Sequence, residues 1–163
     1  HGELLFDCIA LPSAAGWGLE KLVQKKAWHP YPGGAPANVA CALSKLGVSA
    51  GFLGAVGNDE HGEELVSVLD RCGVNTELVE RVSGAATRTV MVTRTRLGER
   101  SFAGFGGGGL SDKFADCRHC VEQYRDDVMT RLRPGSWLVQ GTLGLAYDSS
   151  FESHKLMAEW QEV

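Results

Sequence analysis

Two adjacent glycines and an asparagine form the stretch of this sequence best suited to holding a ligand. Gly33 and Gly34 lie between Pro32 and Ala35-Pro36. Glycine carries no Cβ, so a ligand can approach the backbone here and meet N–H groups that a first helical turn leaves unpaired. Asn38 adds two donors and an acceptor, which suit a polyhydroxylated ligand. The simpler interpretation is a strand-to-helix turn without a ligand, which is the usual meaning of an isolated glycine pair.

A helix that starts directly after the glycine pair places Asn38 one turn away from it. Pro36 favours this start, because a first helical turn does not use the N–H that proline lacks. Gly47 is suited to end the helix in a left-handed conformation. Apolar residues at helical spacing predict one buried face, made of Val39, Ala42, Leu43 and Leu46.

Apolar runs on both sides of this helix predict strands. The run Leu4–Ile9 indicates a buried strand, interrupted by Asp7, which on its own is most simply a loop cap or an edge residue. The run Ser49–Val56 is typical of a parallel strand covered on both faces. A helix capped by Asp59 follows and ends at Gly73. This alternation predicts an α/β sheet, and the second helix has a buried stripe of Leu65, Leu69 and Cys72.

Two extended runs in the middle of the sequence predict a hairpin. Thr87–Thr95 alternates around β-branched residues, Glu99–Phe105 forms the second run, and Arg96-Leu97-Gly98 joins them. The hairpin carries several cations that we expect on a solvent-exposed face, namely Arg88, Arg94, Arg96 and Arg100.

Three further helices and one more strand are predicted from the same periodicity. A short helix is expected at Leu19–Val23, an amphipathic helix over Val121–Leu132, and a final helix through Leu156 and Trp160. Trp137–Val139 indicates another buried strand, which ends near Thr142.

Two other motifs suggest chemistry but have simpler interpretations. Gly104–Gly109 formally fits the G-x-G-x-x-G pattern of dinucleotide-binding proteins, but no small-residue helix follows it, and a flexible loop explains the glycines better. Cys117 and Cys120 have the spacing of zinc ligands, but a structural zinc site needs a second pair. We therefore expect no metal site there.

Composition narrows the class of protein. The chain has 163 residues, of which 44% are hydrophobic and 22% charged, as in a globular domain. A net charge of −4 gives no reason to expect nucleic acid or an anionic membrane as partner, and no apolar run is long enough to span a membrane. Five scattered cysteines suit reduced thiols. We expect an intracellular protein, cytoplasmic or plastid, although a chain that begins at His1 does not show whether a leader precedes it.

The order and intervals of Gly34, Asn38, Ala40, Gly47 and Gly57 resemble the first signature of the PfkB carbohydrate kinases, the ribokinase-like family. The likeness is continuous over residues 33–74, and residues 2–7 are similar to the opening strand of fructokinase-like members. The resemblance covers most of the chain and is weakest after residue 106. There a glycine run replaces the Arg-Asn-Pro segment of many fructokinases, so the resemblance does not name the sugar.

The resemblance implies a ribokinase-like α/β fold, in which helices flank a parallel-rich central sheet and a small β lid comes from within residues 8–32 and 87–105. It implies a sugar kinase that transfers the γ-phosphate of ATP to a sugar hydroxyl, with Mg²⁺ bridging the phosphates. The lid strands allow a homodimer. The implied sugar-binding residues are Asp7, whose carboxylate accepts hydrogen bonds from sugar hydroxyls, together with Gly33, Gly34, Asn38 and, more weakly, Thr142.

The family's second signature, a Gly-Ala-Gly-Asp loop that supplies the catalytic base, does not occur in this sequence. We therefore expect residues 1–163 to be the N-terminal, sugar-binding part of a kinase domain. The C-terminal half, the catalytic residues and the residues that bind ATP and Mg²⁺ would be missing, so the chain by itself would be inactive. One alternative is a non-catalytic PfkB-like interaction protein, and a weaker one is a Rossmann dinucleotide-binding domain that uses the glycine run.

Overall fold

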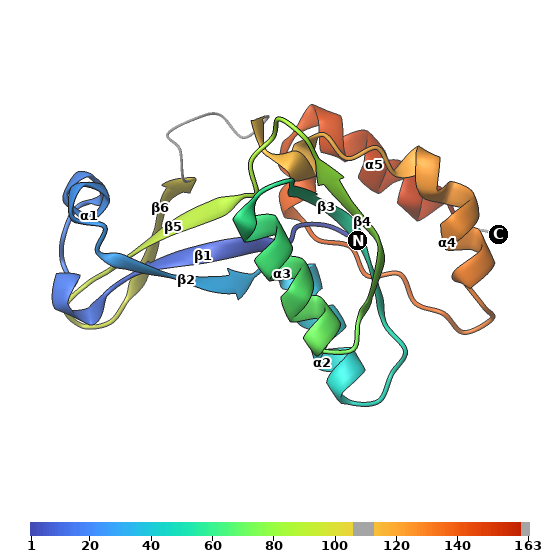
Figure 1. Ribbon diagram of the computed structural model, residues 1–163, viewed down its shortest axis with the longest axis horizontal. Helices are drawn as coiled ribbons and strands as arrows, with labels where there is room; N and C mark the ends of the chain where they lie inside the picture. Colours follow the sequence, from blue (N-terminus) through green and yellow to red (C-terminus); the bar gives the residue numbers. More distant parts are fainter. Residues whose placement is uncertain (106–112, 161–163) are drawn as a thin grey trace.

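A four-stranded mixed sheet forms one end of the molecule. The computed structural model describes residues 1–105 and 113–160 (Figure 1). The strands lie in the order β2-β1-β5-β6, where β1 is antiparallel to β2 and parallel to β5, and β5 is antiparallel to β6. The opening strand and the hairpin are therefore confirmed. The strand bounds are β1 Leu5–Ala10, β2 Trp28–Gly33, β5 Thr89–Arg94 and β6 Arg100–Phe105.

A second, parallel pair of strands lies beside the first sheet. β3 (Gly51–Gly57) and β4 (Asn75–Val82) are joined by α3 (Glu60–Arg71), which gives the expected strand–helix–strand unit. The Gly2 N–H donates a hydrogen bond of 3.3 Å to the Leu53 carbonyl, so the segment before β1 runs along β3. The α/β fold class is thus confirmed, with parallel pairing in both sheets.

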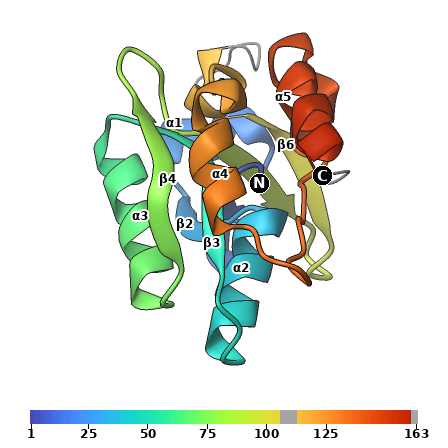
Figure 2. The ribbon, with the colours of Figure 1, turned by 90° about the vertical axis from the view of Figure 1, so that its right-hand side faces the viewer.

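The helices are distributed unevenly around these strands. Figure 1 shows the four-stranded sheet extending to the left with α1 at its far end, whereas α4 and α5 lie at the opposite end. Figure 2 shows α3 and α5 on opposite sides of the strands. The glycines at both predicted helix ends, Gly47 and Gly73, adopt φ angles of 85° and 81°. The helix bounds are α1 Leu19–Lys25, α2 Ala35–Lys45, α3 Glu60–Arg71, α4 Arg125–Arg131 and α5 Asp148–Glu159.

The main core lies where α3 packs against both sets of strands. Phe6 from β1, Val56 from β3, and Leu65 and Leu69 from α3 are almost fully buried in one cluster. The predicted stripe on α3 is therefore confirmed for its two leucines. Cys72 lies at the edge of the same cluster and is only partly buried.

The predicted buried face of α2 is wrong. Val39 is 39% exposed and Leu46 is 80% exposed, whereas Pro36, Ala37 and Ala40 are buried. α2 is rotated so that its small residues meet the core. Val39 and Leu43 border a groove of about 590 Å³, which also reaches Trp137 and Leu138.

The predicted buried strand over Trp137–Val139 is also wrong. The segment has no assigned secondary structure, and Trp137 is 90% exposed. Its position on the rim of the same groove explains the exposure, because no described segment covers that side of it. An apolar triplet indicates burial only when the rest of the fold supplies a covering surface.

Candidate functional site

Strand alternation decides the direction in which Asp7 points. Phe6 and Cys8 pack into the main core, whereas Leu5 joins Val90 and Val92 in a cluster on the other face of the sheet. Successive strand residues point to opposite faces, so Asp7 shares the face of Leu5. This sequence pattern therefore places a half-buried carboxylate on the face that is turned away from the main core.

The structure brings Asp7 and Gly33 together. β1 and β2 pair so that Leu5 lies opposite Gly33 and Asp7 opposite Tyr31. A Cβ atom added at Gly33 would lie 2.5 Å from the Asp7 Oδ2 atom. The missing side chain at Gly33 therefore makes room for the Asp7 carboxylate at the end of β2.

The Asp7 carboxylate receives no hydrogen bond from the residues that the structure describes. Burial raises its pKa, and the positive charge of Arg100 on β6 offsets part of that increase. A partly desolvated carboxylate gains when a ligand supplies hydrogen-bond donors. Asp7 is therefore prepared to accept hydrogen bonds from hydroxyl groups.

Gly34 has a structural role at the turn into α2. Its φ is 100°, and a Cβ at this position would collide with the backbone carbonyl of Glu3. Glu3 itself is buried, and the Oε2 atom of its carboxylate has no hydrogen-bond partner among the described residues. The close approach at Gly34 is thus made by the chain's own backbone.

Glu3 is a residue that the sequence interpretation missed. Burial raises the pKa of its carboxyl, and the nearby backbone N–H groups of Glu3 and Ala35 oppose that shift. A charged residue at the start of an apolar strand run was the available signal. Glu3 precedes β1, and its backbone carbonyl lies against Gly34 at the start of α2.

Asn38 and Thr142 remain candidates by position. Asn38 lies one turn into α2, its side chain is exposed, and its N–H donates to the Gly34 carbonyl over 2.9 Å. Thr142 is exposed, and the next residue, Leu143, packs on the cluster of the sheet face that carries Asp7. Both side chains are exposed, and neither forms a hydrogen bond with Asp7.

A second carboxylate, Asp59, performs structural work. It caps α3 by accepting a hydrogen bond of 2.8 Å from the Gly62 N–H, as predicted. It also accepts from the N–H and the hydroxyl of Thr87, at 2.8 and 2.6 Å. Burial disfavours its charge, but these hydrogen bonds outweigh burial and lower its pKa. The Asp59–Thr87 pair thus ties the start of α3 to the segment that leads into β5.

Arg88 contradicts the expectation of a solvent-exposed face. Arg88 is only 2% exposed, and its guanidinium donates two hydrogen bonds to the Asp116 carboxylate, of 2.6 and 2.9 Å. It also lies 4.6–4.8 Å from the rings of Phe105 and Phe114. Burial opposes the charged guanidinium, but its interactions with Asp116 raise the Arg88 pKa. The other three cations of the hairpin are exposed or partly exposed.

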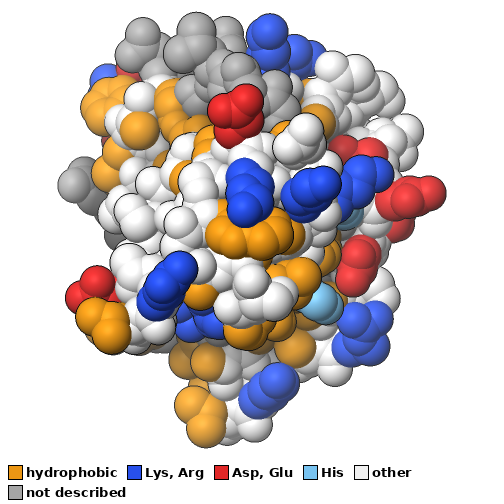
Figure 3. All heavy atoms as spheres, turned by 90° about the vertical axis from the view of Figure 1, so that its left-hand side faces the viewer, with side chains coloured by type: hydrophobic (Ala, Val, Ile, Leu, Met, Phe, Trp, Pro, Cys, Tyr) orange, Lys and Arg blue, Asp and Glu red, His pale blue; other side chains and the backbone are white. Residues whose placement is uncertain are grey.

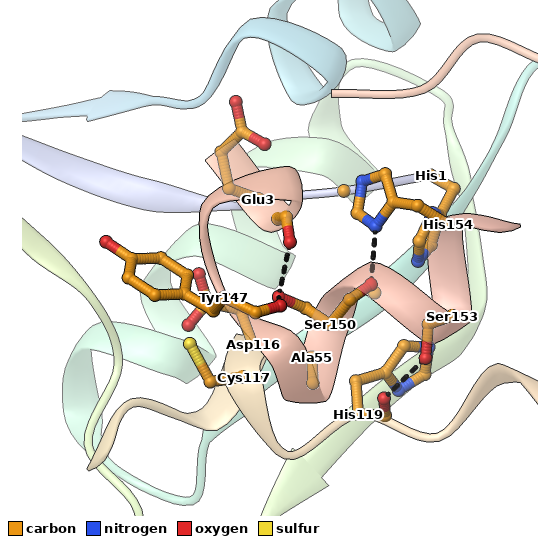
Figure 4. Close-up of a pocket in the computed structure, with 13 residues that line it drawn as sticks. His1, Glu3, Ala55, Asp116, Cys117, His119, Tyr147, Ser150, Ser153 and His154 are labelled. Carbon is orange, nitrogen blue, oxygen red and sulfur yellow. Dashed lines mark hydrogen bonds between the residues drawn. The ribbon is translucent and has the colours of Figure 1, made fainter. Parts of the chain in front are cut away.

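A small polar cavity lies between the start of the chain and α5 (Figure 4). Its volume is about 20 Å³, which is room for a single water molecule and too little for a sugar. The Ser153 hydroxyl donates to the His119 carbonyl over 3.0 Å, and His119 Nδ1 lies 2.9 Å from Glu80 Oε2. Burial lowers the pKa of His119, against the effect of Glu80. The cavity therefore belongs to the packing of α5, and it includes neither Asp7 nor Asn38.

The structure describes only part of the two remaining motifs, the glycine run and the cysteine pair. Residues 106–112 lie outside the described residues, and with them most of the glycine run. Cys117 is buried and accepts a hydrogen bond from Arg88, whereas Cys120 is exposed. No helix in the described part of the chain is long and apolar enough to cross a membrane.

Comparison with protein families gives one match. The profile of the pfkB family carbohydrate kinases matches residues 1–123. Among curated proteins, the chain is 43% identical over 101 residues to probable fructokinase-5 of Arabidopsis thaliana and 45% identical over 101 residues to fructokinase-2 of Oryza sativa subsp. japonica. These alignments cover 62% of this chain but only 30% and 29% of the two relatives. The chain thus spans less than a third of the length of these relatives.

Solved structures of sugar kinases share the fold. An uncharacterized sugar kinase from Pyrococcus horikoshii in complex with ATP has a TM-score of 0.77 and 29% identity, and the match covers 97% of this chain and 47% of that one. Fructokinase from Xylella fastidiosa has a TM-score of 0.63 and 34% identity, over 79% of this chain and 36% of that one. The backbone arrangement around β1, β2 and α2 is therefore shared with proteins that are named sugar kinases.

Proposed function

The chain belongs to the pfkB family of carbohydrate kinases, and from this membership we propose that it forms the sugar-binding part of an ATP-dependent, fructokinase-like sugar kinase. The observation that carries the proposal is the Asp7 carboxylate, which lies against Gly33 and has no hydrogen-bond donor among the described residues. Fructose is the first sugar to test, because several relatives are named fructokinases.

Each candidate residue has a distinct role in this proposal. Asp7 accepts hydrogen bonds from two sugar hydroxyls, and Gly33 leaves the space that the carboxylate and the sugar need. The Asn38 amide both donates and accepts, which suits a hydroxyl at the start of α2. Gly34 shapes the turn, and Thr142 offers a hydroxyl at the edge of the same face. Charged acceptors give the stronger of these bonds, so Asp7 contributes most.

The family implies ATP and Mg²⁺, but the described residues of this chain do not form a site for either. Among residues 1–105 and 113–160, no three His, Cys, Asp or Glu side chains are placed to hold a metal ion. The sequence contains no Gly-Lys-Ser/Thr phosphate loop and no Gly-Ala-Gly-Asp segment. We therefore assign sugar binding to this chain and no step of phosphoryl transfer.

Titration calorimetry with the purified chain tests the proposal. Fructose should bind to the parent protein, and Asp7→Asn should bind it more weakly, because the amide is a neutral acceptor. Asp126→Asn is the matched control, because the Asp126 side chain is 98% exposed and lies outside the site. A coupled assay with ATP and fructose should show no turnover by this chain. A folded parent protein that binds neither fructose nor other ketoses and aldoses would contradict the proposal and favour the interaction protein.

We extend the proposal to a homodimer formed through the four-stranded sheet. β6 is an edge strand in the described sheet, with Phe102 79% exposed, and Leu97 in the adjoining turn is 90% exposed. Figure 3 shows hydrophobic side chains interspersed with Lys and Arg over the end of the molecule that carries this sheet. Sedimentation velocity should give a dimer, and Phe102→Asp should shift it to monomer. A monomeric parent protein would refute the dimer without affecting the sugar site.

A further inference from the structure

Two free cysteines lie on neighbouring helices and have no part in the proposed sugar site. Cys41 lies in the second half of α2, and Cys72 is the residue that ends α3. Both are unbridged and partly buried, and both pack at the edge of the main core. Partial burial leaves each sulfur shielded but still within reach of a small reagent.

The two cysteines pack against the same core cluster, on two helices that are in contact with each other. A separate contact shows that these parts of the helices meet. Ser44 lies one turn after Cys41, and its hydroxyl is 3.0 Å from the position of a Cβ at Gly73, the neighbour of Cys72. Figure 1 shows α2 beside the end of α3, and the two helices are in contact. The face of α2 that carries Cys41 and Ser44 therefore packs on the end of α3.

We propose that Cys41 and Cys72 are a modification site, at which a disulfide reversibly joins α2 to the end of α3 under oxidising conditions. The oxidant is a low-molecular-weight disulfide. A thiolate of the pair attacks one sulfur of the reagent, which forms a mixed disulfide and releases one reagent thiolate. The second cysteine, as thiolate, attacks the mixed disulfide and releases the other. The protein loses two electrons and two protons, and two molecules of reagent thiol are formed.

The reaction should be slow at neutral pH. Burial, followed by the neighbouring Cys72 thiol, raises the pKa of Cys41 to about 11. Only the thiolate attacks a disulfide, so the rate should increase as the pH is raised from 7 to about 9. The pair is therefore suited to respond to a sustained change in redox conditions.

The bond would restrain the helix that carries the proposed sugar residues. α2 begins beside Gly34 and holds Asn38, and Asp59 caps the start of α3. Joining their distal ends closes a loop that contains β3, which restricts the unfolded chain and should raise the melting temperature. The inference does not depend on sugar binding, because it rests only on the packing of α2 against α3.

The other three cysteines differ from this pair in how far they are exposed to solvent. Cys8 is buried in the strand core, and Cys117 is buried and accepts a hydrogen bond from Arg88. Cys120 is exposed and would form mixed disulfides or link two molecules. A Cys120→Ser background therefore removes the reactive surface thiol without touching α2 or α3.

The test uses the folded 163-residue chain with Cys120→Ser, incubated with oxidised glutathione, then denatured and blocked with N-ethylmaleimide. Intact mass should show two fewer blocked thiols than the reduced protein, and peptide mapping should find Cys41 linked to Cys72. The oxidised protein should melt at a higher temperature, and dithiothreitol should reverse both changes. Cys41→Ser and Cys72→Ser, each conservative in size, should lose the linked peptide and the thermal shift.

Two results would overturn the proposal. One is a folded parent protein that keeps all its thiols after prolonged oxidation at about pH 9. The other is a linked peptide that joins Cys8 or Cys117 in place of the α2–α3 pair. Reversal by dithiothreitol in the parent protein keeps the test valid even if a serine variant folds poorly.

Discussion

Asp7 and Asp59 are chemically identical carboxylates that the fold treats in opposite ways. Asp59 accepts three hydrogen bonds, from Gly62 and Thr87, and its pKa is lowered. Asp7 accepts none from the described residues, and its pKa is raised. Each lies against a glycine, since a Cβ would come 2.6 Å from the Asp59 oxygen at Gly57 and 2.5 Å from the Asp7 oxygen at Gly33.

We propose that this difference separates a residue that stabilises the fold from one that is available to a ligand. A saturated carboxylate contributes to folding and has little left to offer a substrate. A carboxylate that is partly desolvated but unsatisfied costs stability, a cost that a bound ligand can offset. Variants of the two carboxylates should therefore differ in both stability and sugar affinity.

The largest expected effect is on stability, from Asp59→Ala. The variant removes the cap of α3 and leaves the Thr87 N–H and hydroxyl without their acceptor, which should cost about 3 kcal/mol. Urea unfolding measures this loss. Asp7→Ala is the matched comparison and should unfold within about 0.5 kcal/mol of the parent protein. Equal losses in the two variants would remove the contrast.

The next effect is on sugar affinity, from Asp7→Ala. Loss of a charged acceptor should weaken fructose binding by about 2 kcal/mol, which is roughly 30-fold in Kd. Titration calorimetry is the measurement. Asp59→Asn, which keeps an oxygen at the helix cap, serves as the comparison and should bind fructose with nearly the parent affinity. A stronger effect from Asp59→Asn would move the sugar away from Asp7.

A smaller effect is expected from Gly33→Ala. The added Cβ meets the far end of the Asp7 side chain, which can turn away, so the fold should be kept. The displaced carboxylate should weaken sugar binding by about 1 kcal/mol. Gly18→Ala is a suitable control, because a Cβ there has no neighbour within 4 Å. Unchanged sugar binding in Gly33→Ala would show that the Asp7–Gly33 contact does not shape the site.

The smallest effect is on the pH dependence of stability. The two carboxylates change the free energy of unfolding in opposite directions as the pH rises. The Asp59 pKa is below the ordinary 3.8, so its stabilisation is present above that value and is lost as the pH falls through the lowered pKa. The Asp7 pKa is above 3.8, so its favourable contribution is present below that value and is lost as the pH rises through the raised pKa.

Urea unfolding between about pH 3 and pH 6 measures both windows. The deficit of Asp59→Asn should shrink as the pH falls. The advantage of Asp7→Asn should appear as the pH rises. Parallel pH profiles for the two variants would mean that both carboxylates have the same environment.

The sequence by itself determined the elements that depend on local patterns. The opening strand, the turn at Gly33-Gly34, the Asp59 cap and the hairpin after Thr87 all follow from spacing, capping and turn residues, and the structure has each of them. The resemblance to a carbohydrate kinase family was also carried by spacing within residues 33–74, and the family match confirms it.

Only the tertiary structure decided which side of an element is covered and which polar groups meet. Arg88 is buried because Asp116, 28 positions later, supplies its partner, and Gly34 is a glycine because the Glu3 backbone passes beside it. Val39 and Trp137 are exposed because no described segment covers their side of the groove. Burial and pairing depend on contacts between distant parts of the chain, whereas periodicity reports only the local conformation.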